Sequence, residues 1–205
     1  RLDFEAGGRK YSDHSTVRFG LRNFERQGRK VLMNGRSVFL RGTLECGVSP
    51  LTGHPSAQAA QWRKIFRQAS AYGINHFRFH CWCPPEAAFD AADELGIMLQ
   101  PEGPQWGPAE GHPEIEEYLR QECFAIVRQY SHHPSFCLFS PGNELEKPHG
   151  EYLSTLVRDL KKEDPSRLYT TSSGWPIPEK LGLDFADDVF ISLHTPHGWM
   201  RGQGR

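Results

Sequence analysis

The sequence predicts an α/β fold built on a parallel sheet. The alternation of its elements supports this prediction, and the length of the chain limits the architecture. Segments typical of strands and of helices alternate along the chain, with about thirty residues from one strand to the next. The chain has 205 residues, whereas a complete (β/α)8 TIM barrel takes roughly 250 residues. Two architectures fit these observations, an open doubly wound sheet and a partial (β/α)8 barrel of about six βα units.

The N-terminal residues differ from the rest, because their pattern is typical of antiparallel strands. Residues 17–26 alternate between apolar and polar side chains, which predicts an extended segment. Asn34 and Gly35 lie between two apolar runs and predict a tight hairpin turn. We therefore expect residues 1–27 to be the tail of a β domain and residues 28–205 to form part of a second domain.

The elements of the alternating part can be placed one by one. Gly73 and Gly96 follow two helical patterns as C-cap residues, and Pro84 opens a helix at its first turn. Residues 101–113 are rich in proline and glycine and predict a loop. The predicted strands are 38–41, 74–79, 97–99, 136–139, 168–171 and 189–193. The predicted helices are 57–72, 84–95, 113–130 and 152–163.

The composition argues against several classes of protein. The net charge of -1 provides no basic surface for a nucleic acid, and the sequence has no apolar run of about 18 residues that would predict a membrane span. No glycine-rich nucleotide-binding motif follows a predicted strand. The five cysteines are irregularly spaced, and Cys81 and Cys83 beside His80 lack the further ligands that a metal site needs. We therefore expect free thiols and no metal.

Polar and tryptophan side chains recur at the points where the predicted strands end. In a barrel or an open parallel sheet, ligands bind at the carboxyl ends of the strands. A purely structural sheet gives no reason to gather such side chains there repeatedly. They are Glu45 and Cys46; His80, Trp82 and Cys83; Glu102, Gln105 and Trp106; Asn143 and Glu144; Ser172, Ser173 and Trp175; and His194, His197 and Trp199.

Glu144, preceded by Asn143, is the most informative of these residues. A glycosidic oxygen is a poor leaving group, and a carboxylic acid with a raised pKa can protonate it. The neighbouring amide can hydrogen-bond the sugar 2-hydroxyl, a contact that tightens in the transition state. On the dipeptide alone, a surface acid at Glu144 beside a helix cap at Asn143 is a better explanation than a catalytic pair. The catalytic interpretation therefore depends on the surrounding sequence.

Five segments of the chain resemble glycoside hydrolase family 2, the family of β-galactosidases, β-glucuronidases and β-mannosidases. They follow the family's order at suitable spacing and cover nearly the whole chain, so together they are far more specific than any one of them. The first, FGLRNFE (19–25), is similar to the exit from the family's β-sandwich domain. Those similar to the hairpin and the first four barrel strands are LMNGRSVFLRGT (32–43), YGINHFRFH (72–80), FDAADELGIMLQPE (89–102) and HHPSFCLFSPGNE (132–144).

The resemblance implies a TIM barrel and a retaining double displacement, with Glu144 as acid/base and Asn143 as its partner. Residues 1–27 would end an immunoglobulin-like β-sandwich domain, and residues 28–205 would be the N-terminal part of the catalytic barrel. The nucleophile would be a glutamate after a seventh strand, which we expect beyond Arg205, so we expect this chain alone to be inactive. The implied protein is an exo-acting glycosidase of oligosaccharides or glycans, without an organic cofactor and exported to the periplasm or cell surface.

The other candidates for substrate binding have equally ordinary alternatives. Galactosidase-like members usually have Arg-x-x-His-Tyr-Pro after the second strand, whereas His80 stands one residue earlier, so it cannot simply take that histidine's role. Arg78 and Glu102 either bind the sugar or pair with each other, and His194 would orient the nucleophile. Tryptophans at strand ends either stack on the sugar or pack within loops, and these are Trp82, Trp106, Trp175 and Trp199.

Three rival interpretations stay open. The first is a catalytically inactive carbohydrate-binding barrel, the second a different barrel hydrolase with the same Asn-Glu pair, and the third an open-sheet protein unrelated to sugars. A glutamate at the end of a seventh strand would favour catalysis over binding. His132 and His133 precede a predicted strand, at the end of a barrel that serves stability, and we expect structural roles for them.

Overall fold

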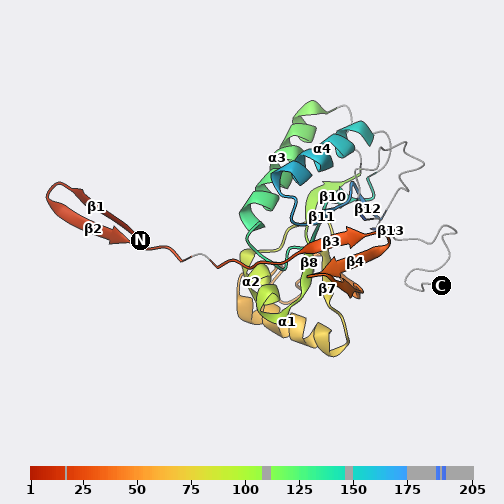
Figure 1. The fold of residues 1–205 in the computed structure, drawn as a ribbon, viewed down its shortest axis with the longest axis horizontal. Helices are drawn as coiled ribbons and strands as arrows, with labels where there is room; N and C mark the ends of the chain where they lie inside the picture. Colours follow the sequence, from red (N-terminus) through yellow and green to blue (C-terminus); the bar gives the residue numbers. More distant parts are fainter. Residues whose placement is uncertain (17, 108–111, 146–149, 175–187, 190, 193–205) are drawn as a thin grey trace.

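The computed structural model describes residues 1–16, 18–107, 112–145, 150–174, 188–189 and 191–192. The chain begins with an antiparallel hairpin of β1 (Leu2–Ala6) and β2 (Arg9–Asp13), which lies apart from the rest of the molecule (Figure 1). Its residues are exposed, and Phe4 stacks on Tyr11 with ring centroids 4.9 Å apart. The extended segment predicted over 17–26 is a strand only in its last part, as β3 (Phe24–Gln27).

A three-stranded antiparallel sheet follows, formed by β3, β4 (Lys30–Met33) and β5 (Arg36–Val38). Asn34 and Gly35 connect β4 to β5 with φ angles of 51° and 75°, so the predicted hairpin turn is confirmed. Both residues adopt the left-handed conformation that a two-residue hairpin needs, and asparagine and glycine tolerate it best.

The first parallel strands are β6 (Gly42–Glu45), β7 (His76–Phe79) and β8 (Met98–Gln100). The prediction that the first barrel strand spans 38–41 was wrong, because Arg36–Val38 pairs with β4 in the hairpin and the parallel strand starts at Gly42. The Asn75 side chain accepts a hydrogen bond from the Arg41 backbone N–H at 2.8 Å, which joins the start of β6 to the start of β7.

The second group of parallel strands is centred on β10 (Leu138–Asn143). Its partners are β9 (Glu102–Trp106), β11 (Leu168–Tyr169) and β12 (Ser173–Gly174), and β12 pairs in turn with β13 (Ile191–Ser192). The loop predicted over 101–113 was wrong in its first half, because β9 pairs with β10 despite its glycine and proline.

The order of the parallel strands decides between the two predicted architectures. A parallel bridge between Leu99 and Phe136 joins the two groups, so the strands succeed one another in chain order from β6 to β13. A barrel has this order, whereas a doubly wound sheet reverses at a switch point. The described strands therefore form part of a (β/α)8 barrel.

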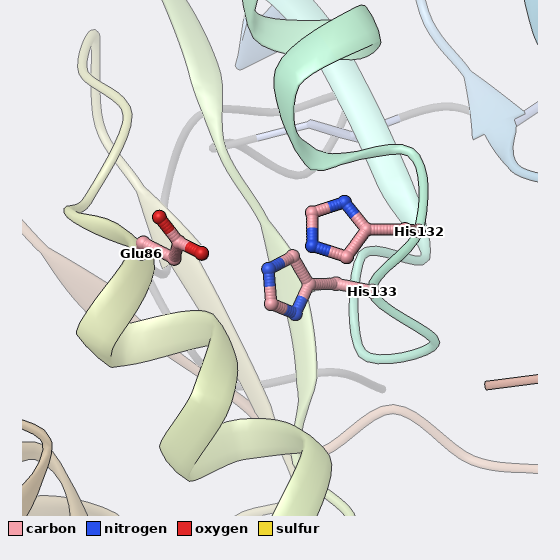
Figure 2. A group of neighbouring side chains, drawn as sticks. All are labelled: Glu86, His132 and His133. Carbon is pink, nitrogen blue, oxygen red and sulfur yellow. The ribbon is translucent and has the colours of Figure 1, made fainter. Parts of the chain in front are cut away.

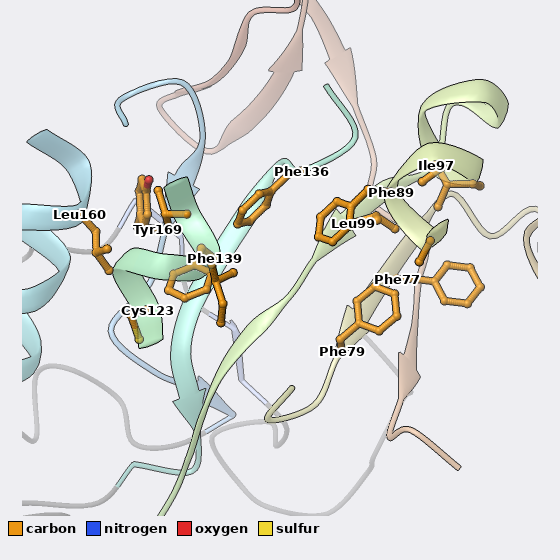
Figure 3. Close-up of a cluster of buried hydrophobic side chains, with 14 of the residues drawn as sticks. Phe77, Phe79, Phe89, Ile97, Leu99, Cys123, Phe136, Phe139, Leu160 and Tyr169 are labelled. Carbon is orange, nitrogen blue, oxygen red and sulfur yellow. The ribbon is translucent and has the colours of Figure 1, made fainter. Parts of the chain in front are cut away.

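The helices are α1 (Ala59–Ala71), α2 (Glu86–Leu95), α3 (Pro113–Tyr130) and α4 (Gly150–Glu163), close to the predicted ranges. Gly96 ends α2 with a φ of 69°, as the C-cap prediction requires. Figure 3 shows the core between helices and strands, where rings such as Phe79, Phe89, Phe136 and Tyr169 are fully buried. No helix of the described chain is long and apolar enough to span a membrane.

The antiparallel sheet packs against the amino ends of the parallel strands. Phe24 of β3 forms a second apolar cluster with Met98, Leu138 and Leu168, which are the first residues of β8, β10 and β11. One end of the strands is therefore covered by apolar packing, which leaves the carboxyl end for polar chemistry.

Candidate active site

A buried ion pair forms the base of the site at the carboxyl ends of the strands. Arg78 of β7 donates from Nε to Oε1 of Glu102 at 2.6 Å and from Nη2 to Oε2 at 3.4 Å. The same Nη2 donates to Oδ1 of Asn143, the last residue of β10. Glu102 and Asn143 have no exposed surface, and Arg78 is 6% exposed. The structure thus brings together three predicted site residues that lie far apart in the sequence.

The Glu102 carboxylate is fixed by further donors from neighbouring strands. Gln100 of β8 donates from Nε2 to Glu102 Oε1 at 3.3 Å and to Ser173 Oγ at 3.1 Å. The backbone N–H of Cys81 donates to Glu102 Oε2 at 2.9 Å. A buried carboxylate needs such charge-assisted and backbone hydrogen bonds to offset its lost hydration. Arg78 and Glu102 were predicted either to bind the sugar or to pair with each other. The structure shows them paired in a salt bridge.

Two buried amides at this end have unused hydrogen-bonding capacity. Within the described part of the chain, Asn143 Nδ2 has no hydrogen-bond partner, and neither amide atom of Gln105 has one. Gln105 lies in β9 and is 4% exposed. An unpaired buried polar group costs about 1–3 kcal/mol, a cost that a polar ligand removes when it binds. The sequence places Gln105 near a strand end, but no motif or spacing marks this glutamine as a binding residue.

Glu144 directly follows β10 and has an unusual backbone conformation. Its φ is 51°, in the left-handed region, and its N–H donates to the Ser173 carbonyl at 2.8 Å. The carboxylate is half-buried, and its Oε2 accepts a hydrogen bond from Trp106 Nε1 at 3.3 Å. Non-glycine residues in this region are strained by about 1–3 kcal/mol and cluster at functional sites.

The rim of the site contains aromatic side chains in two different settings. Trp106 is 67% exposed, and the His80 ring meets it edge-on at 5.2 Å. Trp82 instead packs edge-on against Phe79 at 5.4 Å, and its Nε1 donates to the Glu45 carbonyl at 3.2 Å. Trp106 thus lies beside Glu144 with His80 against its ring, whereas Trp82 packs into the wall of the site.

Glu45, the last residue of β6, also lies near this wall. Burial raises the pKa of its carboxyl group, against the lowering effect of the Gly47 N–H, which donates to Oε2 at 2.8 Å. The sequence places Glu45 at a strand end without predicting a role for it. Three residues predicted to bind the substrate, Trp175, His194 and Trp199, lie outside the described residues.

The cysteines near the site are protonated thiols at neutral pH. Burial, followed by the negative charge of Glu102, raises the pKa of Cys81 to about 11. Burial also raises the pKa of Cys83. No disulfide joins any of the five cysteines in the structure. Since the thiolate is the reactive form, neither Cys81 nor Cys83 is suited to act as a nucleophile.

The strand order defines a barrel of the TIM type. Its buried charges lie at the carboxyl ends of the strands, where TIM barrels have their active sites. The chain belongs to glycoside hydrolase family 2, since the family described as "Glycosyl hydrolases family 2, TIM barrel domain" matches residues 24–195.

The relatives of known name are much longer than this chain. A β-glucuronidase of the dog, Canis lupus familiaris, is 24% identical over all of this chain and 32% of its own length. A β-glucuronidase of Bacteroides fragilis is 27% identical over 80% of this chain and 25% of its own length. The chain therefore spans about a quarter to a third of these two relatives.

Solved structures support the fold at lower sequence identity. A Bacteroides uniformis β-glucuronidase 2, covalently bound to cyclophellitol-6-carboxylate aziridine, has a TM-score of 0.71 and 22% identity, covering 84% of this chain and 23% of its own. A galacturonate-bound β-galacturonidase from Eisenbergiella tayi has a TM-score of 0.66 and 20% identity, covering 74% and 28%. At these identities the likeness shows the fold alone.

Proposed function

We propose that this chain is the N-terminal part of the catalytic barrel of a retaining, exo-acting glycoside hydrolase, with Glu144 as its acid/base residue. The observation that carries the proposal is the position of Glu144, which follows β10, is half-buried and adjoins the buried Arg78–Glu102–Asn143 network. The proposal keeps residues 1–27 as the end of a β-sandwich domain and residues 28–205 as barrel.

In the proposed first step, Glu144 gives its proton to the glycosidic oxygen while the nucleophilic carboxylate attacks the anomeric carbon, so the glycosidic bond breaks and a glycosyl ester forms. In the second step, the Glu144 carboxylate takes a proton from the water that attacks the anomeric carbon and breaks this ester. The Nδ2 of Asn143, which has no hydrogen-bond partner among the described residues, would donate to the sugar 2-hydroxyl. The exposed indole of Trp106 would pack on the sugar, and its bond to Glu144 orients the acid.

A retaining mechanism needs a second carboxylate about 5–5.5 Å from the first. Glu102 is a poor nucleophile, because it is fully buried and accepts hydrogen bonds from Arg78, Gln100 and Cys81. We assign the nucleophile to a glutamate after a seventh strand, so the 205-residue chain by itself is expected to be inactive. The names of the relatives make a β-glucuronide the first substrate to test.

The decisive experiment uses the longest reading frame that contains this chain, assayed with aryl β-glucuronides, β-galactosides and β-mannosides. Glu144→Ala should lower kcat by about 10²- to 10⁴-fold, with the greater loss on poorly activated leaving groups, because protonation matters most there. Azide, a nucleophile that needs no base, should restore turnover of an activated aryl glycoside and yield a glycosyl azide.

Glu25→Ala is the matched control, since Glu25 is an exposed glutamate of β3 and should leave kcat unchanged. Equal activity of Glu144→Ala and wild type on every substrate would refute the assignment. Sugar binding without any turnover by the wild-type protein would favour the inactive carbohydrate-binding barrel instead.

A further inference from the structure

A second group of polar side chains lies at the amino end of β10, away from Glu144. Glu86 is the first residue of α2, and His132 and His133 lie in the turn between α3 and β10. One ligand atom from each of the three residues lies within 4.8 Å of the other two. Figure 2 shows the carboxylate and both imidazole rings directed toward one another.

We propose that Glu86, His132 and His133 form a binding site for a divalent transition-metal cation of the Zn²⁺ type. Imidazole nitrogen and carboxylate oxygen are ligands that Zn²⁺ prefers, and two histidines with one glutamate form a familiar three-ligand set. The fourth tetrahedral position would hold water.

The strongest evidence is the state of the His133 ring. This residue is 3% exposed, and its Nε2 has no hydrogen-bond partner in the described part of the chain. Its Nδ1 donates to Oδ2 of Asp93 at 2.7 Å, which leaves the lone pair on Nε2, the nitrogen that faces Glu86 (Figure 2). A carboxylate behind a ligating histidine is the usual device that fixes the ring for a metal.

The surroundings hold this ring firmly in place. Asp93 also accepts the Ser135 N–H through Oδ1 at 2.9 Å, and the Phe89 ring lies 5.2 Å from the His133 ring. Glu86 and Asp93 are seven residues apart on α2, so they occupy the same helix face and flank His133.

The outer ligands can adjust to a bound ion. Metal–nitrogen and metal–oxygen bonds of about 2.0–2.2 Å require ligand atoms closer together than the 4.8 Å within which the three lie. Glu86 is exposed and His132 half-exposed, so their side chains can close onto the ion while His133 stays fixed.

A cation at this position would tie the start of α2 to the turn before β10, the strand whose far end carries Asn143. Because the ion would bind the folded chain, it would raise the free energy of unfolding with increasing metal concentration. A purely structural role for His133 leaves its Nε2 unpaired, whereas coordination satisfies it.

The full chain, freed of metal, can be titrated with Zn²⁺ by calorimetry and with Co²⁺ by visible absorption. We expect one equivalent to bind, Co²⁺ to show the d–d bands of a low-symmetry nitrogen and oxygen site, and Zn²⁺ to raise the Tm. Glu86→Gln and His132→Asn should each weaken binding at least about tenfold, as does loss of a metal-site contact elsewhere.

Both of these variants alter side chains that are not fully buried, so the fold should survive them. Asp93→Asn adds a third measurement, since it should weaken Co²⁺ binding although Asp93 is not a ligand. His54→Ala, at an exposed histidine, is the matched control and should bind as wild type does. No stoichiometric binding, unchanged affinity in Glu86→Gln and His132→Asn, or a thiolate-to-Co²⁺ charge-transfer band would each overturn the proposal.

Discussion

The two ends of the parallel strands bury polar groups in different ways. At the carboxyl end, Arg78 and Glu102 pair directly, and Asn143 accepts a further bond from the arginine. At the amino end, the buried imidazole rings are His76, the first residue of β7, and His133, which precedes β10. A second buried ion pair lies at this end as well, between Arg167 and Asp164 just before β11. Each of these imidazoles has an Nε2 without a partner in the described part of the chain.

The two ends therefore differ in their buried imidazoles with an unpaired nitrogen, which only the amino end has among the described residues. At the carboxyl end, the hydrogen bonds of the Arg78–Glu102 pair hold Asn143 in place. Imidazole nitrogens can bind protons or metal cations, so the amino end is where these ions can alter stability. The barrel thus separates its candidate catalytic carboxylate, Glu144, from the imidazoles of the amino end.

The largest effect should come from breaking the charged pair at the carboxyl end. Glu102→Gln leaves the Arg78 guanidinium buried without its countercharge, and such a loss destabilises by about 3–5 kcal/mol. Urea unfolding of the chain, followed by circular dichroism, measures this change.

Glu94→Gln is the matched control on the molecular surface. Arg63 contacts Glu94 at 2.6 Å, the same distance as in the buried pair, but both side chains are about a third exposed. Since exposed ion pairs contribute little, this variant should unfold almost as wild type does. Similar losses in both variants would show that burial does not distinguish the two pairs.

A pH-dependent effect should appear at the amino end through His76. Burial, and then the positive charge of Arg78, lowers the pKa of His76 to about 4 in the folded chain, against 6.5 for an unperturbed histidine. Between these values the unfolded chain binds a proton that the folded chain does not, so stability falls as the pH drops from about 6.5 to 4. The full difference corresponds to about 3 kcal/mol.

Urea unfolding at pH 7 and near pH 4 tests this expectation. His76→Gln removes the titrating group, so the variant should lose about 3 kcal/mol less than wild type over that interval. His54→Gln, at an exposed histidine, should follow wild type. Parallel losses in wild type and His76→Gln would mean that His76 is not the source of the pH dependence.

Much of the fold could be predicted from local sequence signals. The Asn34-Gly35 turn and the Gly96 cap required particular backbone angles, and few residues other than asparagine and glycine adopt them easily. The strand of residues 102–106 was missed, because its evidence is a pairing with β10 that lies more than thirty residues away in sequence. The proline and glycine within this strand are typical of a loop, so they predicted a loop there instead.

The site could be predicted only in part, for a similar reason. Arg78, Glu102 and Asn143 were predicted to lie together because charged and amide groups at strand ends meet in a barrel, and the structure places them in contact. Gln100 was missed, because its importance lies in bonds to Glu102 and Ser173 that no spacing reveals. The pairing of His133 with Asp93 likewise joins residues forty positions apart.

The smallest effect should reveal strain at the carboxyl end itself. Glu144 has a φ of 51°, a conformation that costs an L residue about 1–2 kcal/mol and glycine little. Glu144→Gly should therefore be more stable than Glu144→Ala by about 1 kcal/mol, although both lack the carboxyl group. The same pair of substitutions at Glu25, in the extended strand β3, should give the opposite order, because glycine weakens a strand by about 0.5–1 kcal/mol relative to alanine. If glycine were the less stable choice at both positions, the backbone of Glu144 would be unstrained, and its left-handed conformation would not mark it out as a functional residue.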